Sequence, residues 1–94
     1  MKVGKHTAFM LDFVSDFVDG DISRDHFEMD YYGYLIEHFP MMEKEDILLA
    51  KKFVSTIDDT VEYAQANVMS DEDFRIAINN ALCDLLGIDE PDLI

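Results

Sequence analysis

The segment between Phe53 and Phe74 carries six acidic side chains and no basic one. Asp58, Asp59 and Glu62 lie in its first part, and helical spacing places Asp58 and Glu62 one turn apart, with Asp59 beside them. Like charges at this spacing cost a helix roughly a few tenths of a kcal/mol, so the cluster does not help folding. The chemistry that it offers is the attraction and faster association of a basic partner.

Two further features belong to this acidic segment. Tyr63 is expected to point away from the buried side of its helix and to be exposed near Asp59, where a tyrosine can anchor a protein partner. Three more acids follow Ser70, where they also favour the positive end of a helix dipole. The predicted partner-binding residues are Asp58, Asp59, Glu62, Tyr63, Asp71, Glu72 and Asp73.

Segment 19–23, Asp-Gly-Asp-Ile-Ser, resembles the middle of a calcium-binding EF-hand loop. With Gly20 at the sixth loop position, the first, third and twelfth positions are Ser15, Phe17 and His26. Calcium needs carboxylates at these positions, and none is present. A glycine that ends one helix, followed by a serine that begins the next, explains the segment better.

Metal and catalytic motifs are also missing from the rest of the chain. His6, His26 and His38 form no Glu-x-x-His or His-x-x-x-His pair and have no cysteine cluster beside them. His38 continues the apolar row of its own helix, which is typical of a residue at the edge of a core. Cys83 has no basic helper to activate its thiol, and there is no glycine-rich phosphate loop or nucleophile elbow. We therefore expect a protein that is not an enzyme and that uses no catalytic residues, no metal and no cofactor.

Composition limits the function further. The chain has 94 residues, with 21 acids against 7 bases and a formal net charge of −14. Residues 1–52 hold 11 acids against 6 bases, and residues 53–94 hold 10 acids against Arg75 alone. This balance disfavours nucleic acid and anionic membranes as partners, and one cysteine excludes a disulfide scaffold. A hydrophobic content of 49% disfavours disorder, so we expect one acidic globular domain, 1–94.

No targeting or membrane-spanning segment is expected. Lys2 and Lys5 precede an apolar stretch as in a signal peptide, but Asp12 and Asp16 interrupt it and no small-residue cleavage site follows. No apolar run reaches the roughly 18–20 residues that a membrane-spanning helix needs. The expected location is the cytoplasm.

Apolar residues recur three and four positions apart along almost the whole chain, which is typical of helices. The third helix has the most regular apolar row, and we expect it to be buried at Ile47, Ala50, Val54, Ile57, Val61, Ala64 and Val68. No segment shows the alternation of a strand. The predicted helices are 7–19, 23–39, 43–67 and 71–86.

The expected helix ends follow from local residue types. Ser23 and Ser70 are expected to cap helix starts, and Ser70 with Asp73 resembles a capping box. Gly20 and Pro40 are expected to end the first and second helices. Gly87, followed by Ile88 and Pro91, is expected to end the last. The predicted fold is all-α, a small antiparallel four-helix bundle with short connections, and the alternative is three helices with an irregular segment around Gly33.

The chain resembles the immunity proteins of colicin D-like toxins and of contact-dependent growth inhibition systems. The similar pattern spans about residues 9–87 and comprises segment 13–23, Phe27 with Glu28, and segments 50–53, 57–59 and 70–74. The chain departs from it in a tyrosine-rich second helix.

The resemblance implies a protein that binds a cognate toxin nuclease, often one that cleaves tRNA, and covers its basic active-site cleft. Acidic side chains would then take the place of RNA phosphates. Asp58, Asp59 and Glu62 match the acidic stretch of the family's third helix, and Asp71, Glu72 and Asp73 are second choices.

Two classes of function therefore compete. The first is an immunity protein that neutralises a bacterial toxin nuclease by binding it through acidic residues. The alternative is a non-enzymatic regulatory or adaptor bundle that binds a protein partner through an apolar face. That face would contain Tyr32, Ile36, Leu48, Leu49, Tyr63 and Ile76.

Overall fold

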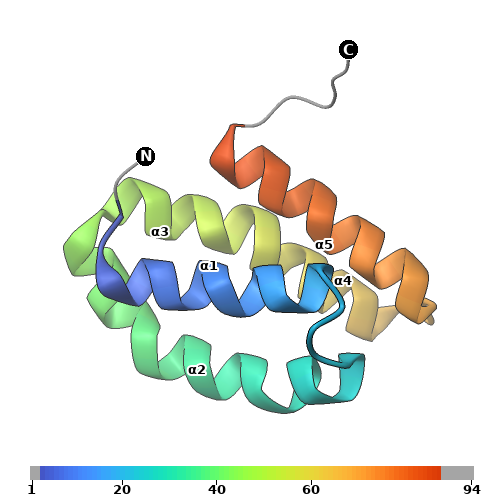
Figure 1. Ribbon diagram of the computed structural model, residues 1–94. Coiled ribbons are helices and arrows are strands. Elements are labelled where there is room, and N and C mark those ends of the chain that lie inside the picture. The colour runs from blue at the N-terminus through green and yellow to red at the C-terminus, as the bar shows by residue number, and fades with distance from the viewer. Residues whose placement is uncertain (1–2, 88–94) are drawn as a thin grey trace.

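The computed structural model describes residues 3–87 and is all-α within them (Figure 1). Ile88 and Pro91, which are expected to help end the last helix, lie outside this range. In chain order the elements are α1 (Lys5–Val18), α2 (Arg24–Glu45), α3 (Ile47–Phe53), the π-helical turn η1 (Val54–Asp58), α4 (Asp59–Ala66) and α5 (Asp71–Leu86). Because α3, η1 and α4 follow one another without a break, there are four helical segments, and successive segments run in opposite directions (Figure 1). The predicted all-α bundle is confirmed.

The predicted serine caps and glycine ends are present. The Ser23 hydroxyl accepts a hydrogen bond from the backbone N–H of His26 at 3.1 Å, and the Ser70 hydroxyl accepts one from Asp73 at 3.1 Å. Gly87 follows α5 with a φ of 71°, in the left-handed region that glycine adopts without strain. Local sequence thus places α5 at the predicted bounds of 71–86.

Pro40 does not end the second helix, which is a correction to the prediction. α2 continues through Pro40 to Glu45. Proline removes the N–H that would bond the carbonyl of Ile36, but Ile36 and Pro40 are both exposed, so water can satisfy that carbonyl. Met42 lies beyond the proline and is fully buried, so its packing favours the longer helix.

The third predicted helix therefore begins later than residue 43 and is not uniform. Asp46 is extended, and its carboxylate accepts a hydrogen bond from the N–H of Leu49 at 3.1 Å, which caps α3. Further along, η1 contains one more residue per turn than an α-helix. Hydroxyl groups support this turn, since Thr56 donates to the carbonyl of Lys52 at 2.7 Å and Thr60 donates to that of Thr56 at 2.8 Å.

The π-helical turn changes which residues face the core. Phe53 is fully buried in place of Val54, which is only partly buried. The predicted burial of Ile47 and Val68 is also wrong, because both are exposed at the two ends of this helical segment. The remaining predicted positions of the row are confirmed as buried: Ala50, Ile57, Val61 and Ala64.

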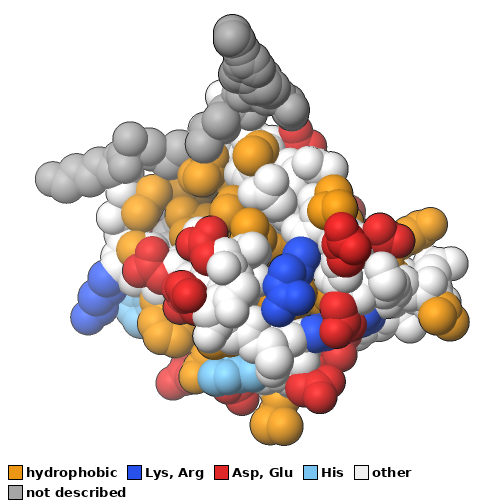
Figure 2. Space-filling view, turned by 45° about the vertical axis from the view of Figure 1, so that its right-hand side comes forward, with side chains coloured by type: hydrophobic (Ala, Val, Ile, Leu, Met, Phe, Trp, Pro, Cys, Tyr) orange, Lys and Arg blue, Asp and Glu red, His pale blue; other side chains and the backbone are white. Residues whose placement is uncertain are grey.

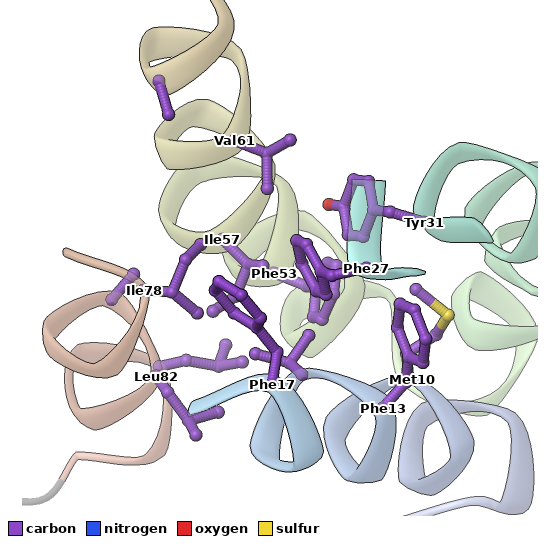
Figure 3. Close-up of a cluster of buried hydrophobic side chains, with 14 of the residues drawn as sticks. Met10, Phe13, Phe17, Phe27, Tyr31, Phe53, Ile57, Val61, Ile78 and Leu82 are labelled. Atoms are coloured by element: carbon purple, nitrogen blue, oxygen red, sulfur yellow. The ribbon is translucent and has the colours of Figure 1, made fainter. Parts of the chain in front are cut away.

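Aromatic side chains from three helices form the centre of the core (Figure 3). Phe27 on α2 stacks against Phe17 on α1, with ring centroids 4.5 Å apart, and lies 5.9 Å from Phe74 on α5. Phe53 and Ile57 pack into the same cluster from the long third segment. The bundle is therefore held together by one core to which every helical segment contributes.

Glu45 holds the start of α1 although it is the last residue of α2. Its carboxylate accepts hydrogen bonds from the N–H of His6 at 2.9 Å, from the N–H of Thr7 at 3.0 Å and from the Thr7 hydroxyl at 2.8 Å. These N–H groups belong to the first turn of α1, where Gly4 provides no capping side chain. A Cβ atom on Gly4 would clash with the Glu45 side chain, so glycine permits this contact.

We expect Glu45→Gln to lower stability most at neutral pH. Burial raises the pKa of Glu45, but the hydrogen bonds from His6 and Thr7 outweigh it and hold the pKa below its ordinary value. A lowered folded-state pKa gives stability that is present above the unfolded-state pKa and is lost as pH falls through the folded-state value. Urea denaturation should therefore show a difference from wild type at pH 7 that shrinks in acid.

Glu43→Gln is the matched control, because Glu43 is exposed on the same helix. It should change stability little at either pH. An equal loss in the two variants, or a loss in Glu45→Gln that does not depend on pH, would contradict the assigned role of Glu45.

Candidate functional site

A groove of about 430 Å³ lies between the third helical segment and α5, and we call it the α4–α5 groove. One wall comes from η1 and α4, the other from α5, and Met69 of the connecting loop lines it as well. Its polar lining includes Ser55, Thr56, Asp59, Thr60, Tyr63, Asn80 and Asp84.

Two carboxylates face this groove from opposite walls. Asp59 and Asp84 are both exposed, and neither forms an ion pair with any residue in the range 3–87. Tyr63 is 60% exposed beside them, which confirms its predicted exposure. Carboxylates, hydroxyl groups and an amide around a tyrosine ring can receive the ammonium or guanidinium group of a basic side chain.

Asp58 does not lie on the exposed flank, and this prediction is wrong. Its side chain is buried, with 9% relative exposure, and Oδ1 accepts a hydrogen bond from the Tyr31 hydroxyl at 3.1 Å. The extra residue in η1 turns Ile57 and Asp58 together toward the core. Asp58 is therefore a core residue that joins the third helical segment to α2.

Burial has the largest effect on the pKa values of Asp58 and Tyr31. It raises the pKa of Asp58, the hydrogen bond from Tyr31 opposes that rise, and the charge of Asp59 adds to it. Burial also raises the pKa of Tyr31, and the Asp58 carboxylate raises it further. Each shift favours the neutral form of its own group, and the buried Asp58 carboxyl is not part of an exposed acidic surface.

Glu62 is exposed but does not line the α4–α5 groove. Glu62 lies one helical turn after Asp58, whose carboxylate contacts Tyr31, so it belongs to the side of α4 nearer α2. Burial raises the pKa of Tyr32 on α2, and the charges of Asp58 and Glu62 raise it further. The three acids predicted to form one cluster are thus divided: Asp59 faces the groove, Glu62 faces α2 and Asp58 is inside.

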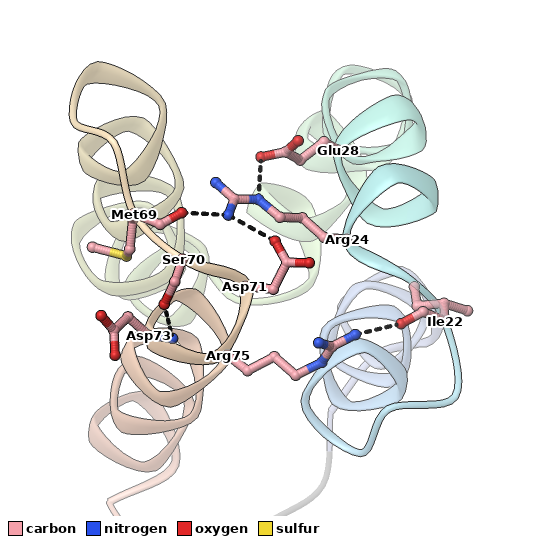
Figure 4. A network of polar contacts seen from close by, with 8 residues as sticks. All are labelled: Ile22, Arg24, Glu28, Met69, Ser70, Asp71, Asp73 and Arg75. Atoms are coloured by element: carbon pink, nitrogen blue, oxygen red, sulfur yellow. Dashed lines mark hydrogen bonds and ion pairs between the residues drawn. The ribbon is translucent and has the colours of Figure 1, made fainter.

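Asp71, Glu72 and Asp73 form the exposed first turn of α5. Asp71 pairs with Arg24 of α2 at 3.0 Å, and the N–H of Asp73 donates to Ser70 (Figure 4). Asp73 shares a helical row with Asn80 and Asp84, so it extends the acidic edge of the groove toward the start of α5.

Both arginines are used within the fold. Arg24 also pairs with Glu28 at 3.1 Å and donates to the carbonyl of Met69. Arg75 donates to the carbonyls of Phe17 at 3.0 Å and Ile22 at 3.1 Å, which ties α5 to the end of α1. Neither guanidinium neutralises the groove, and Figure 2 shows a face on which acidic side chains outnumber basic ones.

The connection in segment 19–23 has a structural role. The N–H of Asp21 donates to the carbonyl of Asp16 at 2.8 Å, and the carbonyl of Ile22 receives Arg75. Gly20 adopts a φ of 85°, as expected for a helix-ending glycine. Within residues 3–87 no group of three or more His, Cys, Asp or Glu side chains is arranged to hold a metal ion.

The residues of the expected apolar face come from several helices, and two of them are partly buried. Tyr32 and Leu49 pack partly against the core. The other four expected residues are 52–76% exposed and come from three helical segments: Ile36 from α2, Leu48 and Tyr63 from the long third segment, and Ile76 from α5. None of the helices among the described residues has the length and apolar character needed to cross a bilayer.

The groove brings together residues that the sequence interpretation found and others that it missed. Asp59 and Tyr63 were expected at a binding site, whereas Asp84 and Asn80 were not. The only signal for Asp84 in the sequence is its spacing of four from Asn80 and eleven from Asp73, which places all three on one side of α5. Comparison with protein-family models, curated protein sequences and solved structures gave no significant match.

Proposed function

We propose that this chain is an immunity protein that binds a bacterial toxin nuclease and covers its basic active-site cleft. The observation that carries the proposal is the α4–α5 groove, where Asp59 and Asp84 face a shared space without an ion-pair partner among residues 3–87. A nuclease cleft is basic because it binds phosphates, so carboxylates on an inhibitor can occupy the same positions. Such a protein acts by occlusion and needs no catalytic group.

The charge of the whole chain supports the same partner. A net charge of −14 attracts a basic protein over a distance and speeds association, especially at low salt. At contact, Tyr63 supplies an exposed aromatic ring between carboxylates, and tyrosines of this kind often contribute strongly to protein interfaces. Long-range attraction by the whole chain and a local anchor at the groove therefore favour the same kind of partner.

The proposed setting is the cytoplasm of the cell that makes the toxin, because a tRNA-cleaving toxin reaches its substrate there. The proposed complex contains one protein partner and no nucleic acid, since the acidic groove repels phosphates.

The test uses the C-terminal domain of a secreted toxin encoded beside the gene for this chain. Coexpression of the wild-type chain should rescue cells from that domain, and the purified proteins should form a complex. Asp59→Asn with Asp84→Asn should weaken the complex by about tenfold or more and flatten its dependence on salt. Calorimetry at two salt concentrations measures both effects.

Asp12→Asn with Asp16→Asn is the matched control, because it removes the same charge from exposed positions on α1. An equal loss of affinity in the two double variants would show that net charge, rather than the groove, determines binding. Absence of rescue and of a complex would contradict the proposed function itself.

A further inference from the structure

The imidazole rings of His6 and His38 face each other between the first turn of α1 and the later part of α2. Their Nδ1 atoms are 2.8 Å apart, and their ring centroids are 5.0 Å apart. With one proton between the two nitrogens, one Nδ1 donates a hydrogen bond to the other. Without that proton, both lone pairs are directed into the same small space.

We propose that His6 and His38 form a binding site for a divalent transition-metal ion, with Cu²⁺ and Zn²⁺ as the best candidates. Zinc binds histidine nitrogens at about 2.0–2.1 Å, so two tetrahedral ligands lie roughly 3.3 Å apart. The Nδ1 atoms therefore need to separate by about half an ångström, and the rings need to turn so that both lone pairs point at an ion beside the line between the two nitrogens. When an ion binds both Nδ1 atoms, the proton between them moves through solvent to Nε2 of the same ring, so each neutral imidazole keeps one N–H and both Nδ1 lone pairs are available to the metal.

Neighbouring groups hold both histidines in place. The His38 ring stacks on Phe9, with centroids 4.3 Å apart, and presents an edge to Tyr34 at 6.4 Å. Glu45 fixes His6 through the backbone N–H, at 2.9 Å, and leaves the imidazole free to face His38. Supporting contacts of this kind orient metal ligands and raise affinity.

The donor set determines the kind of metal. No third His, Cys, Asp or Glu joins the pair among residues 3–87, and both Glu45 oxygens already accept hydrogen bonds from His6 and Thr7. Water would complete the coordination. Two imidazoles favour Cu²⁺, Ni²⁺ and Zn²⁺ over Mg²⁺ and Ca²⁺, which prefer oxygen ligands, and among the first three Cu²⁺ binds most strongly.

The site was not visible in the sequence because its ligands are 32 residues apart and come from different helices. It goes beyond the proposed function, and its test needs no partner protein. Untagged protein is titrated with Cu²⁺ and with Zn²⁺ by calorimetry, and electron paramagnetic resonance of the Cu²⁺ form reports the bound nitrogens. We expect one ion per chain, hyperfine coupling to two imidazole nitrogens and a higher melting temperature with metal.

His6→Gln and His38→Gln should each lower the affinity by about tenfold or more and abolish the metal-dependent rise in melting temperature. Glu45 bonds the backbone of His6, so these variants keep that anchor, and circular dichroism checks their folding. His26→Gln is the matched control, since His26 pairs with Asp30 at 3.2 Å elsewhere on α2. Unchanged affinity in His6→Gln and His38→Gln, or an equal loss in His26→Gln, would overturn the assignment.

Discussion

Phe27→Ala should lower the free energy of unfolding by about 3–5 kcal/mol. Phe27 is fully buried, and its ring centroid lies 4.5 Å from that of Phe17, 5.2 Å from Phe13, 5.3 Å from Tyr31 and 5.9 Å from Phe74. Removing the ring loses its transfer free energy and leaves a cavity where three helices meet. Small domains are stable by only about 5–15 kcal/mol, so the variant should lose at least about a fifth of its stability.

Urea denaturation followed by circular dichroism measures this loss. Met29→Ala is the control, because Met29 lies on the same helix with 79% exposure and should cost no more than about 0.5 kcal/mol. A loss below about 1 kcal/mol in Phe27→Ala would mean that the aromatic cluster is not the centre of the core.

The Tyr31–Asp58 contact should respond differently to the loss of each partner. Tyr31→Phe should cost about 1–3 kcal/mol, because it leaves the buried Asp58 carboxyl without its hydrogen bond. Asp58→Asn keeps an oxygen that can accept from Tyr31 and removes a charge that burial disfavours. At neutral pH this variant should therefore be as stable as wild type or more stable.

The pH dependence provides a second measurement on the same pair. Burial raises the folded-state pKa of Asp58, so the folded protein binds the proton more tightly than the unfolded chain does. Stability from this group is then present at low pH and is lost as pH rises from the unfolded-state pKa through the raised folded-state value. The advantage of Asp58→Asn should appear across that interval and vanish in acid.

Denaturation of wild type, Asp58→Asn and Tyr31→Phe at several pH values tests both expectations. If Asp58→Asn were as destabilising as Tyr31→Phe at neutral pH, the ionised carboxylate would be the stabilising form, which would contradict the raised pKa of Asp58. Asp58→Asn should also leave the affinity for the proposed toxin partner unchanged, which separates its core role from that of Asp59.

Several elements of the fold could be predicted because their causes are local. α5 has the predicted bounds because Ser70 caps its start and Gly87 ends it, each through a contact or conformation of neighbouring residues. The predicted helix end at Pro40 was wrong because only half of the energy balance is local. The cost of a proline inside a helix can be read from the sequence, whereas the burial of Met42, which offsets that cost, depends on how the other helices pack. The π-helical turn could not be predicted for a different reason, since the apolar residues around it still recur three and four positions apart, as in an ordinary α-helix.

The candidate site could be predicted in part. Asp59 and Tyr63 are one turn apart on one helix, so periodicity alone places them together. Asp84 comes from α5, 25 positions after Asp59, and faces it only because α5 packs against η1 and α4.

The sequence by itself determined the helical class, most helix ends and the excess of acid in residues 53–94, because periodicity, capping and charge are properties of neighbouring residues. Only the tertiary structure decided which acids are available to a partner. The winding of η1 turned Asp58 into the core beside Tyr31, and the packing of α5 placed Asp84 opposite Asp59. It likewise brought His6 to His38, since contacts between distant segments depend on how whole helices pack.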